Sequence, residues 1–311
     1  LLGTADEALT ATRIRAAGGT VLGRIRVELA AAADVDASGA PGPFALGLVG
    51  WLGYELHEET LDVPAVGPRR HEDALLLRVD RAIAIDHGDG DRGWLLARGA
   101  EWNGELARWR DETLAAVKAL VPGRPSTRRF APRSGTGVGS VPERAKRVEG
   151  PPTAHWATTD AEYADRIRRA QRLIADGDAY QLCLTSEVAV AGAFDPVETY
   201  RRLRRGSPTH HGGLIVSGAT ALLSASPERF LAIGPDRVVE TRPIKGTRPR
   251  GADPLSDAEL ARELLASEKE RAENLMIVDL MRNDLSRVCE VGSVWVPSLL
   301  AVESYPHVHQ L

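Results

Sequence analysis

The chain has 311 residues, 43% of them hydrophobic and 26% charged, with a formal net charge of −4. This composition is that of an ordinary globular protein with a sizeable core, and the interspersed charges give no reason to expect a nucleic-acid partner. No apolar run reaches the ~18 residues that span a membrane, and no signal-peptide pattern is present. With two cysteines, Cys183 and Cys289, we expect reduced, buried thiols and a cytoplasmic protein.

The first 120 residues predict an N-terminal α+β part. The expected elements are a helix from about residue 4 to Gly19, strands over 74–86 and 94–97 joined by a hairpin turn, and a helix over 105–120. Glycines at 47, 50 and 53 favour a close approach of backbones over a binding role, because glycine in regular structure usually marks such contacts.

Residues 121–152 lose all periodicity and are rich in proline, glycine, serine and arginine. A mobile linker is expected over residues 121–157. It divides the N-terminal part at 1–120 from a catalytic part at 158–311.

The catalytic part predicts alternating helices and short strands. The expected elements are a helix from Thr159 or Asp160 to Gly177, a strand over 180–190, a helix from Asp195 to Arg205, an antiparallel meander over 214–216, 221–224, 229–233 and 238–241, a long helix after the N-cap Ser256, and strands over 294–296 and 299–302.

Residues 239–251, V-E-T-R-P-I-K-G-T-R-P-R-G, form a segment that we call the lysine turn. Its prolines and Gly246 exclude a helix interior or a central strand. The chain has four lysines among 39 basic residues, so arginine is its usual cation. A lysine at position 245 therefore indicates an amine that must be able to lose its proton, which arginine cannot do. The alternative is a solvated lysine on a turn.

Glu270 and Glu273 lie three residues apart, so on a helix their carboxylates project from one face. Two carboxylates with waters suit Mg²⁺; the alternative is a solvated face of Glu–Arg pairs. The run L-M-I-V-D-L after Glu273 is too apolar for an exposed helix, and we expect this segment to be partly buried. For Glu228, the residues alone leave open a structural ion pair with Arg229 or another arginine.

Four segments in this order resemble the chorismate-binding enzymes, and within them the aminodeoxychorismate (para-aminobenzoate) synthase component I family, relatives of anthranilate synthase component I. They are S-A-S-P-E-R-F at 224–230, the lysine turn, S-E-K-E-R-A-E-N-L-M-I-V-D-L-M-R-N-D-L-S-R-V at 267–288, and G-S-V-W-V-P at 292–297. The resemblance is clear over 158–311 and weaker over 43–98. Its specific element is P-I-K-G-T, because the anthranilate synthases typically have alanine at the position of Lys245.

The resemblance implies an α+β fold of the anthranilate synthase component I type, with large antiparallel sheets packed with helices. It also implies that the chain is incomplete at both ends, since the family continues for about another hundred residues, including further glutamate ligands of magnesium.

The activity implied is amination of chorismate at C4 to 4-amino-4-deoxychorismate, on the way to para-aminobenzoate and folate. Ammonia would come from a glutamine amidotransferase, as a separate subunit or a fused domain. Lys245 would attack C2 while the C4 hydroxyl leaves, and Glu228 would be the general acid. Mg²⁺, held directly by Glu273 and through water by Glu270, would bind the ring carboxylate.

The resemblance also implies substrate contacts from Gln181, Gly246, Thr247 and His309. Relatives that add water at C2 have a lysine base where Gln181 stands, so this chain should not make isochorismate efficiently. Relatives usually have two adjacent histidines, or at least the second, where this chain has His309 and Gln310. One of these two residues must therefore supply the contact.

Two other functions stay open. One is anthranilate synthase component I, which Lys245 disfavours. The other is a non-catalytic relative that serves as a scaffold for the amidotransferase; Gln310 and the missing C-terminal segment favour it.

Overall fold

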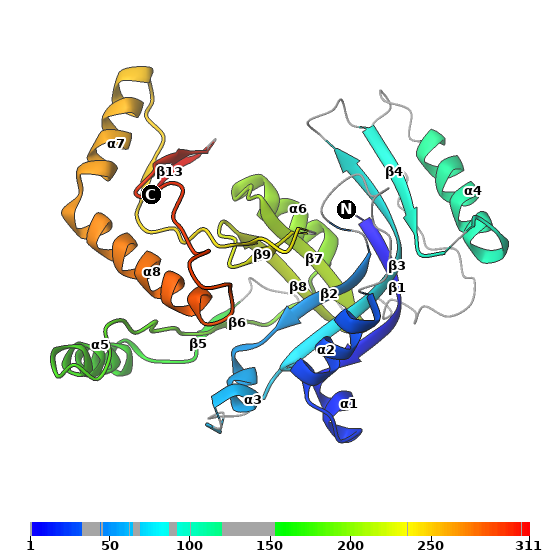
Figure 1. Cartoon of the computed structure of the whole chain (residues 1–311), viewed down its shortest axis with the longest axis horizontal. Coiled ribbons are helices and arrows are strands. Elements are labelled where there is room, and N and C mark those ends of the chain that lie inside the picture. The colour runs from blue at the N-terminus through cyan, green and yellow to red at the C-terminus, as the bar shows by residue number, and fades with distance from the viewer. Residues whose placement is uncertain are drawn as a thin grey trace. The chain divides into compact units, whose positions relative to one another are not determined.

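The computed structural model of the chain describes residues 2–32, 44, 46–61, 63–64, 69–86, 92–99, 101–119, 153–234, 236–305 and 307–311. Every strand pair in these ranges is antiparallel, and helices stand between groups of strands along the chain (Figure 1). The predicted α+β class is confirmed.

The chain divides into two compact units. Unit 1 comprises residues 1–136 and 234–238, and unit 2 comprises residues 137–233 and 239–311. The predicted linker at 121–157 lies for the most part outside the described residues, so the division into 1–120 and 158–311 stays a prediction.

Unit 1 is built on a four-stranded sheet with β3 (Ala74–Asp86) at its centre. The strands β1 (Leu2–Thr10) and β2 (Gly47–Leu52) pair with the first part of β3, and β4 (Arg92–Ala97) pairs with its end. The strands expected over 74–86 and 94–97 are confirmed, while their turn lies outside the described residues.

The helices of unit 1 lie between and after these strands in the sequence. They are α1 (Ala11–Ala16), α2 (Val21–Ala32), a 3₁₀ turn at Tyr54–His57, α3 (Glu58–Leu61) and α4 (Gly104–Ala119). The helix expected over 105–120 is confirmed. Gly50 has the predicted structural role, because a Cβ there would lie 1.8 Å from the carbonyl oxygen of Leu75.

The helix expected from residue 4 is wrong over its first half. Residues 2–10 form β1 and pair with β3 along nearly their whole length, and only then does α1 begin. Thr10 caps α1 by accepting a hydrogen bond from the backbone N–H of Arg13. Pairing with a neighbouring strand has overridden the helix propensity of this alanine-rich segment.

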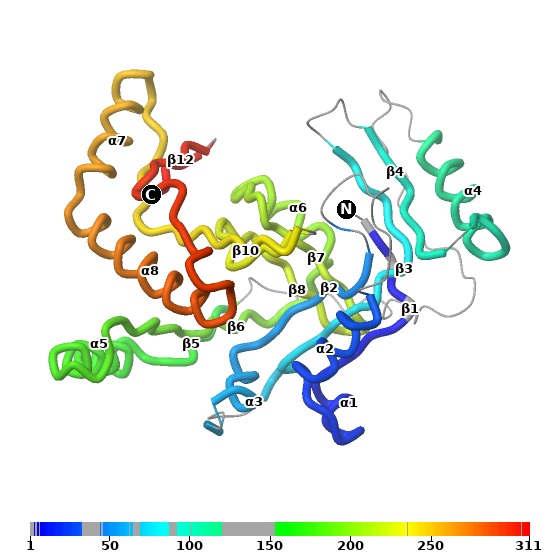
Figure 2. Tube along the Cα trace, in the orientation of Figure 1, coloured from blue at the N-terminus to red at the C-terminus, as the bar shows by residue number. Residues whose placement is uncertain are grey.

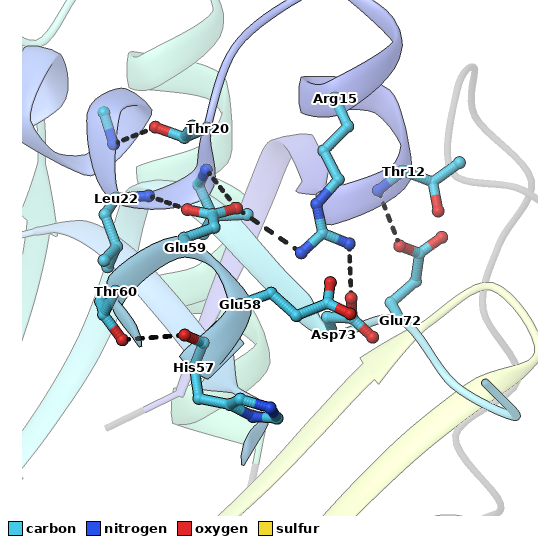
Figure 3. Close-up of polar contacts among 12 residues, drawn as sticks. Thr12, Arg15, Thr20, Leu22, His57, Glu58, Glu59, Thr60, Glu72 and Asp73 are labelled. Carbon is cyan, nitrogen blue, oxygen red and sulfur yellow. Dashed lines mark hydrogen bonds and ion pairs between the residues drawn. The ribbon is translucent and has the colours of Figure 1, made fainter. Parts of the chain in front are cut away.

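Carboxylates from a distant segment cap both N-terminal helices, as Figure 3 shows. Glu59 accepts hydrogen bonds from the backbone N–H groups of Val21 (3.1 Å) and Leu22 (3.2 Å), at the start of α2. Glu72 accepts one from Thr12 at the start of α1 (3.1 Å). The first N–H groups of a helix have no partner within the helix and attract negative charge. These bonds therefore fasten α1 and α2 to the segment that leads into β3.

Unit 2 contains four helices and four small antiparallel sheets in its described part. The helices are α5 (Asp160–Ala175), α6 (Pro196–Gly206), α7 (Pro254–Ala266) and α8 (Glu268–Ser286). The strands are β5 (Ala154–Trp156) with β6 (Val188–Val190), β7 (His211–Ser217) with β8 (Thr220–Ser226), β9 (Ala232–Ile233) with β10 (Val239–Glu240), and β13 (Val308–Gln310) between β11 (Thr247–Pro249) and β12 (Glu303–Ser304).

Local signals fix the ends of α5 and α6. Thr159 and Glu162 form a capping box at the start of α5, and Gly177 follows its end with φ +84°. Asp195 caps α6, where Pro196 occupies the first turn. These boundaries confirm the predictions, because each depends on residues within a few positions of the helix end.

The predicted strands of unit 2 are only partly correct. β6 takes up just the last three residues of the strand expected over 180–190, and no paired strand forms over 294–302 in this described stretch. The expected meander is instead two separate pairs, β7–β8 and β9–β10. A strand needs a partner to satisfy its backbone, and the sequence pattern alone does not say where partners lie.

The long helix expected after Ser256 is two helices. Asp253 caps α7, and Ser256 is the second member of that capping box. Ser267 leaves the helical conformation, with φ −65° and ψ 111°, and its side chain caps α8. The cysteines also differ from expectation: both are free, but Cys183 is exposed and Cys289 half-buried. None of the described helices is long and apolar enough to cross a membrane.

Candidate active site

The lysine turn lies in unit 2 and is held by the last residues of the chain. Lys245 donates its backbone N–H to the carbonyl oxygen of Leu311 (2.7 Å), and Leu311 donates to the carbonyl oxygen of Gly246 (3.3 Å). β11 then pairs with β13, which sets Thr247 opposite Gln310. Figure 2 shows the red C-terminal end returning to the yellow lysine turn. A segment 60 residues further along thus fixes the backbone on which Lys245 stands.

Gly246 has a conformation and a surrounding that only glycine fits. Its φ is +81°, in the left-handed region that other residues avoid. A Cβ at this position would lie 2.9 Å from Cδ1 of Leu264 and 3.0 Å from Oε2 of Glu270. The lysine turn therefore packs directly on α7 and α8.

The carboxylates of α8 face the cations of the lysine turn. Nζ of Lys245 lies 3.6 Å from Oε1 of Glu273, and these side chains are 25% and 33% exposed. Nη1 of Arg248 lies 3.8 Å from Oε1 of Glu270, and its Nε lies 3.1 Å from Oε1 of Glu263. Ser267 accepts a hydrogen bond from the backbone N–H of Glu270 and so begins α8 in the phase that turns Glu270 and Glu273 to the lysine turn, whereas Glu263 belongs to α7.

This donor set fits a hard divalent cation. Three carboxylates, from Glu263, Glu270 and Glu273, stand against two cations, so negative charge is in excess. Within the described part of the chain, no three or more histidine, cysteine, aspartate or glutamate side chains gather as a metal site. Two carboxylates are enough for Mg²⁺, which usually keeps several water or substrate oxygens as ligands.

The side chain of Glu228 is hydrogen-bonded to the residue before Lys245. It follows β8, and its Oε1 accepts a hydrogen bond from the backbone N–H of Ile244 (3.2 Å). Arg229 instead pairs with Glu240, at 2.7 Å between Nη2 and Oε1. These contacts place the carboxylate of Glu228 on the lysine turn rather than on its neighbouring arginine.

His309 is almost completely buried, at 2% exposure, and both of its ring nitrogens have partners. Nδ1 lies 2.8 Å from Oγ of Ser304, and Nε2 lies 2.9 Å from Oδ1 of Asp257 in α7. Asp257 also accepts hydrogen bonds from Arg250 and from the backbone of Gly251. The Arg250 guanidinium, the Gly251 amide and His309 hold the pKa of Asp257 well below its ordinary value. This cluster joins β13 to α7 (Figure 1).

Gln310 lies on the next position of β13 and is 8% exposed. It lines a cavity of about 70 Å³, together with Pro208, Thr209, His210, Pro227, Tyr305, His307 and Val308. A cavity of this volume holds water molecules rather than a ring, since ligand pockets usually exceed ~300 Å³. Gln181 is exposed in the unpaired stretch before β6, and no described hydrogen bond or ion pair links it to the lysine turn.

The structure thus brings six of the predicted site residues together at the lysine turn: Lys245, Gly246, Thr247, Glu228, Glu270 and Glu273. His309 lies on β13, opposite Arg248 of the lysine turn. Sequence reasoning missed Asn274, which is 5% exposed and donates a hydrogen bond from Nδ2 to the carbonyl oxygen of Leu311 (3.2 Å). Its spacing of four residues from Glu270 was the available signal, because such pairs share a helix face.

Several known proteins are similar to this chain. The family model described as chorismate binding enzyme matches residues 5–311. An aminodeoxychorismate synthase from Streptomyces pristinaespiralis is 40% identical over 299 residues, which are 94% of this chain and 39% of the relative. An anthranilate synthase component 1 from Streptomyces coelicolor is 37% identical over 301 residues, covering 94% of this chain and 56% of the relative.

The fold also has a solved counterpart. The crystal structure of anthranilate synthase component I from Streptococcus pneumoniae aligns with a TM-score of 0.66 at 22% identity, over 87% of this chain and 58% of that one. The expected fold type is confirmed. The chain spans 35–39% of the length of two Streptomyces aminodeoxychorismate synthases. Because the family match runs through both units and includes the lysine turn and α8, this chain belongs to the chorismate binding enzymes.

Proposed function

We propose that this chain carries the catalytic lysine of an enzyme that aminates chorismate at C4 and forms 4-amino-4-deoxychorismate. The observation that carries the proposal is the position of Lys245, whose amine faces Glu273 at 3.6 Å while the adjoining backbone N–H of Ile244 binds Glu228. Relatives named aminodeoxychorismate synthase, at 40% and 41% identity, support this assignment.

The reaction begins with the amine of Lys245 in its neutral form. Its lone pair attacks C2 of chorismate, the ring double bonds shift, and the C4–O bond breaks. Ammonia then attacks C4 and the lysine nitrogen leaves C2, so that chorismate and ammonia become 4-amino-4-deoxychorismate and water. Nζ of Lys245 lies 3.6 Å from Oε1 of Glu273, so this contact must open before the amine can attack.

Glu228 is the proposed general acid for the departing hydroxyl. A hydroxide is a poor leaving group, and a carboxylic acid that transfers its proton as the C4–O bond breaks makes water the product. The hydrogen bond from Ile244 holds this carboxyl one residue from the nucleophile. That bond supports a role in the same reaction step.

Glu273 and Glu270 are the proposed magnesium ligands, the first directly and the second through water. The bound ion would supply positive charge that holds the ring carboxylate of the substrate. The two carboxylates that α8 presents from one face to the lysine turn support the assignment.

Gly246 and Thr247 are proposed to contact the substrate through backbone and hydroxyl groups. Direct contact by His309 is harder to support, since both of its ring nitrogens are engaged. We assign that contact to Gln310 and give His309 the role of holding β13. The place of Gln181 near the substrate stays a prediction.

Ammonia is proposed to come from a glutamine amidotransferase, as a partner subunit or a fused domain. The name "component 1" of a relative from Klebsiella aerogenes, 45% identical over 150 residues, supports a second component.

Anthranilate synthesis is the second candidate, favoured by the Streptomyces coelicolor relative. It needs amination at C2 and loss of pyruvate. A covalent lysine at C2 would block that position, so Lys245 argues against it.

The test is to incubate the full-length protein with chorismate, Mg²⁺ and ammonium and to identify the product by mass and by the position of its amine. An amine at C4 with the enolpyruvyl group retained is the expected result. Anthranilate would establish the second candidate, and unchanged chorismate would favour the non-catalytic scaffold.

A further inference from the structure

We propose that Asn274 is a positioning residue that sets the distance between the amine of Lys245 and the carboxylates of α8. It would act through the backbone of Leu311, without touching the substrate. The effect on turnover rests on the proposed function, but the geometry can be tested without it.

One carbonyl group joins α8 to the lysine turn. The carbonyl oxygen of Leu311 accepts hydrogen bonds from Nδ2 of Asn274 (3.2 Å) and from the backbone N–H of Lys245 (2.7 Å). Leu311 also donates its own N–H to the carbonyl oxygen of Gly246. The backbone on both sides of the lysine side chain is therefore connected to a single buried amide on α8.

The helix presents three polar side chains to this segment from one face. Glu270, Glu273 and Asn274 occupy positions i, i+3 and i+4, which point the same way. The two glutamates face cationic side chains of the lysine turn, at 3.8 Å and 3.6 Å. Asn274 differs from them because it is neutral and its partner is backbone.

This difference defines its role. Both glutamates pair with long charged side chains, whereas Asn274 binds the backbone through a neutral amide–carbonyl bond. Asn274 is only 5% exposed, so water does not compete for its amide. It can therefore hold α8 at a fixed distance from the backbone of Lys245.

The first test compares three variants of the full-length protein. Asn274→Leu removes the amide while keeping a side chain of similar bulk, and Asn274→Gln restores an amide that is one methylene longer. Asn283→Leu is the matched control, because Asn283 lies on the same helix and is exposed. Each variant is assayed for chorismate amination with ammonium and Mg²⁺, and its thermal midpoint is measured.

The proposal predicts a kcat for Asn274→Leu that is lower by roughly 10- to 100-fold, because sub-ångström placement of a nucleophile has effects of this size. KM for chorismate should stay within about twofold, since binding groups are left in place. Asn274→Gln should recover part of the loss, and Asn283→Leu should match the wild type. An unchanged kcat for Asn274→Leu would overturn the proposal.

The second test needs no activity. Amide hydrogen exchange, followed by mass spectrometry, should become faster in Asn274→Leu for the peptide spanning residues 244–248, and stay unchanged for peptides of α5 and α6. Faster exchange throughout unit 2, with a thermal midpoint lowered to match, would mean that Asn274 only stabilises the fold and would refute the proposal. If the wild type makes no C4 amine, the proposed function fails, whereas this exchange pattern still decides the role of Asn274.

Discussion

The choice between arginine and lysine is informative at the scale of single residues. Arg248 and Arg250 bind carboxylates around the lysine turn, as arginines do in much of this chain. At position 245 the cation is a lysine instead of an arginine. This lysine faces Glu273, and the backbone N–H of the preceding residue binds Glu228. The composition alone shows that a lysine is unusual in this chain. It does not show which residues surround Lys245, because they come from α8 and from the segment after β8.

Replacing Gly246 by alanine should destabilise the protein through two separable effects. A left-handed residue other than glycine costs roughly 1–2 kcal/mol, and the added methyl would also collide with Leu264 and Glu270. Gly177→Ala is the matched control, because Gly177 has φ +84° with nothing within 4 Å of its added Cβ.

Chemical denaturation should therefore show Gly246→Ala to be less stable than Gly177→Ala by about 1–3 kcal/mol, the usual penalty of overpacking. Equal losses for the two variants would show that the lysine turn does not pack closely on α7 and α8.

Glu273→Gln tests the proposed metal ligand. Losing a direct carboxylate should weaken Mg²⁺ binding by roughly tenfold or more, since even groups that only support a ligand have effects of this size. Isothermal calorimetry on the full-length protein measures this affinity independently of turnover. Glu259→Gln, an exposed position on α7, should bind Mg²⁺ like the wild type. Equal affinity for both variants would remove Glu273 from the metal site.

At the scale of elements, predictions from sequence succeeded where a few neighbouring residues decide the outcome. The capping box of α5 and the proline at the start of α6 gave correct helix ends. They failed at β1 and over residues 180–187, where the outcome depends on whether a distant strand is available to pair. The break at Ser267 was also missed, although it is this break that starts α8 in its phase toward the lysine turn.

The link between α7 and β13 should make stability depend on pH through Asp257. Its pKa is lowered in the folded protein, chiefly by Arg250, so the folded state stabilises the ionised carboxylate. This contribution is complete above the unfolded-state pKa of about 3.9 and disappears as pH falls below it.

Asp257→Asn should consequently lower the free energy of unfolding at pH 7, and the difference from the wild type should shrink as the pH falls below about 4. Asp279→Asn is the control, because Asp279 forms only an exposed pair with Arg282, and such pairs contribute little. A deficit for Asp257→Asn that is the same at pH 3 and pH 7 would contradict this account.

For the whole molecule, the family could be predicted from short motifs, and the assembly of the site could not. P-I-K-G-T and the glutamates of α8 are local patterns, and the family match over residues 5–311 agrees with them. Leu311 carries no such signal and Asn274 carries only its spacing from Glu270, because the importance of both residues arises when β13 returns to the lysine turn. The assignment of His309 shows the same limit, since its burial against Asp257 depends on a contact across 52 residues.

The mass of the peptide containing Lys245 is the most direct measure of the proposed mechanism. The full-length protein is incubated with chorismate and Mg²⁺ without ammonia, quenched, digested and analysed by mass spectrometry. Lys245→Arg is the control, because arginine keeps the positive charge opposite Glu273 but cannot act as a neutral nucleophile.

The account predicts that Lys245 gains the mass of chorismate less one water, that ammonium removes this adduct, and that Lys245→Arg and Lys245→Ala form no adduct and lose amination by roughly a hundredfold or more. An unmodified Lys245, in a protein that still makes the C4 amine when its lysine is replaced, would contradict it.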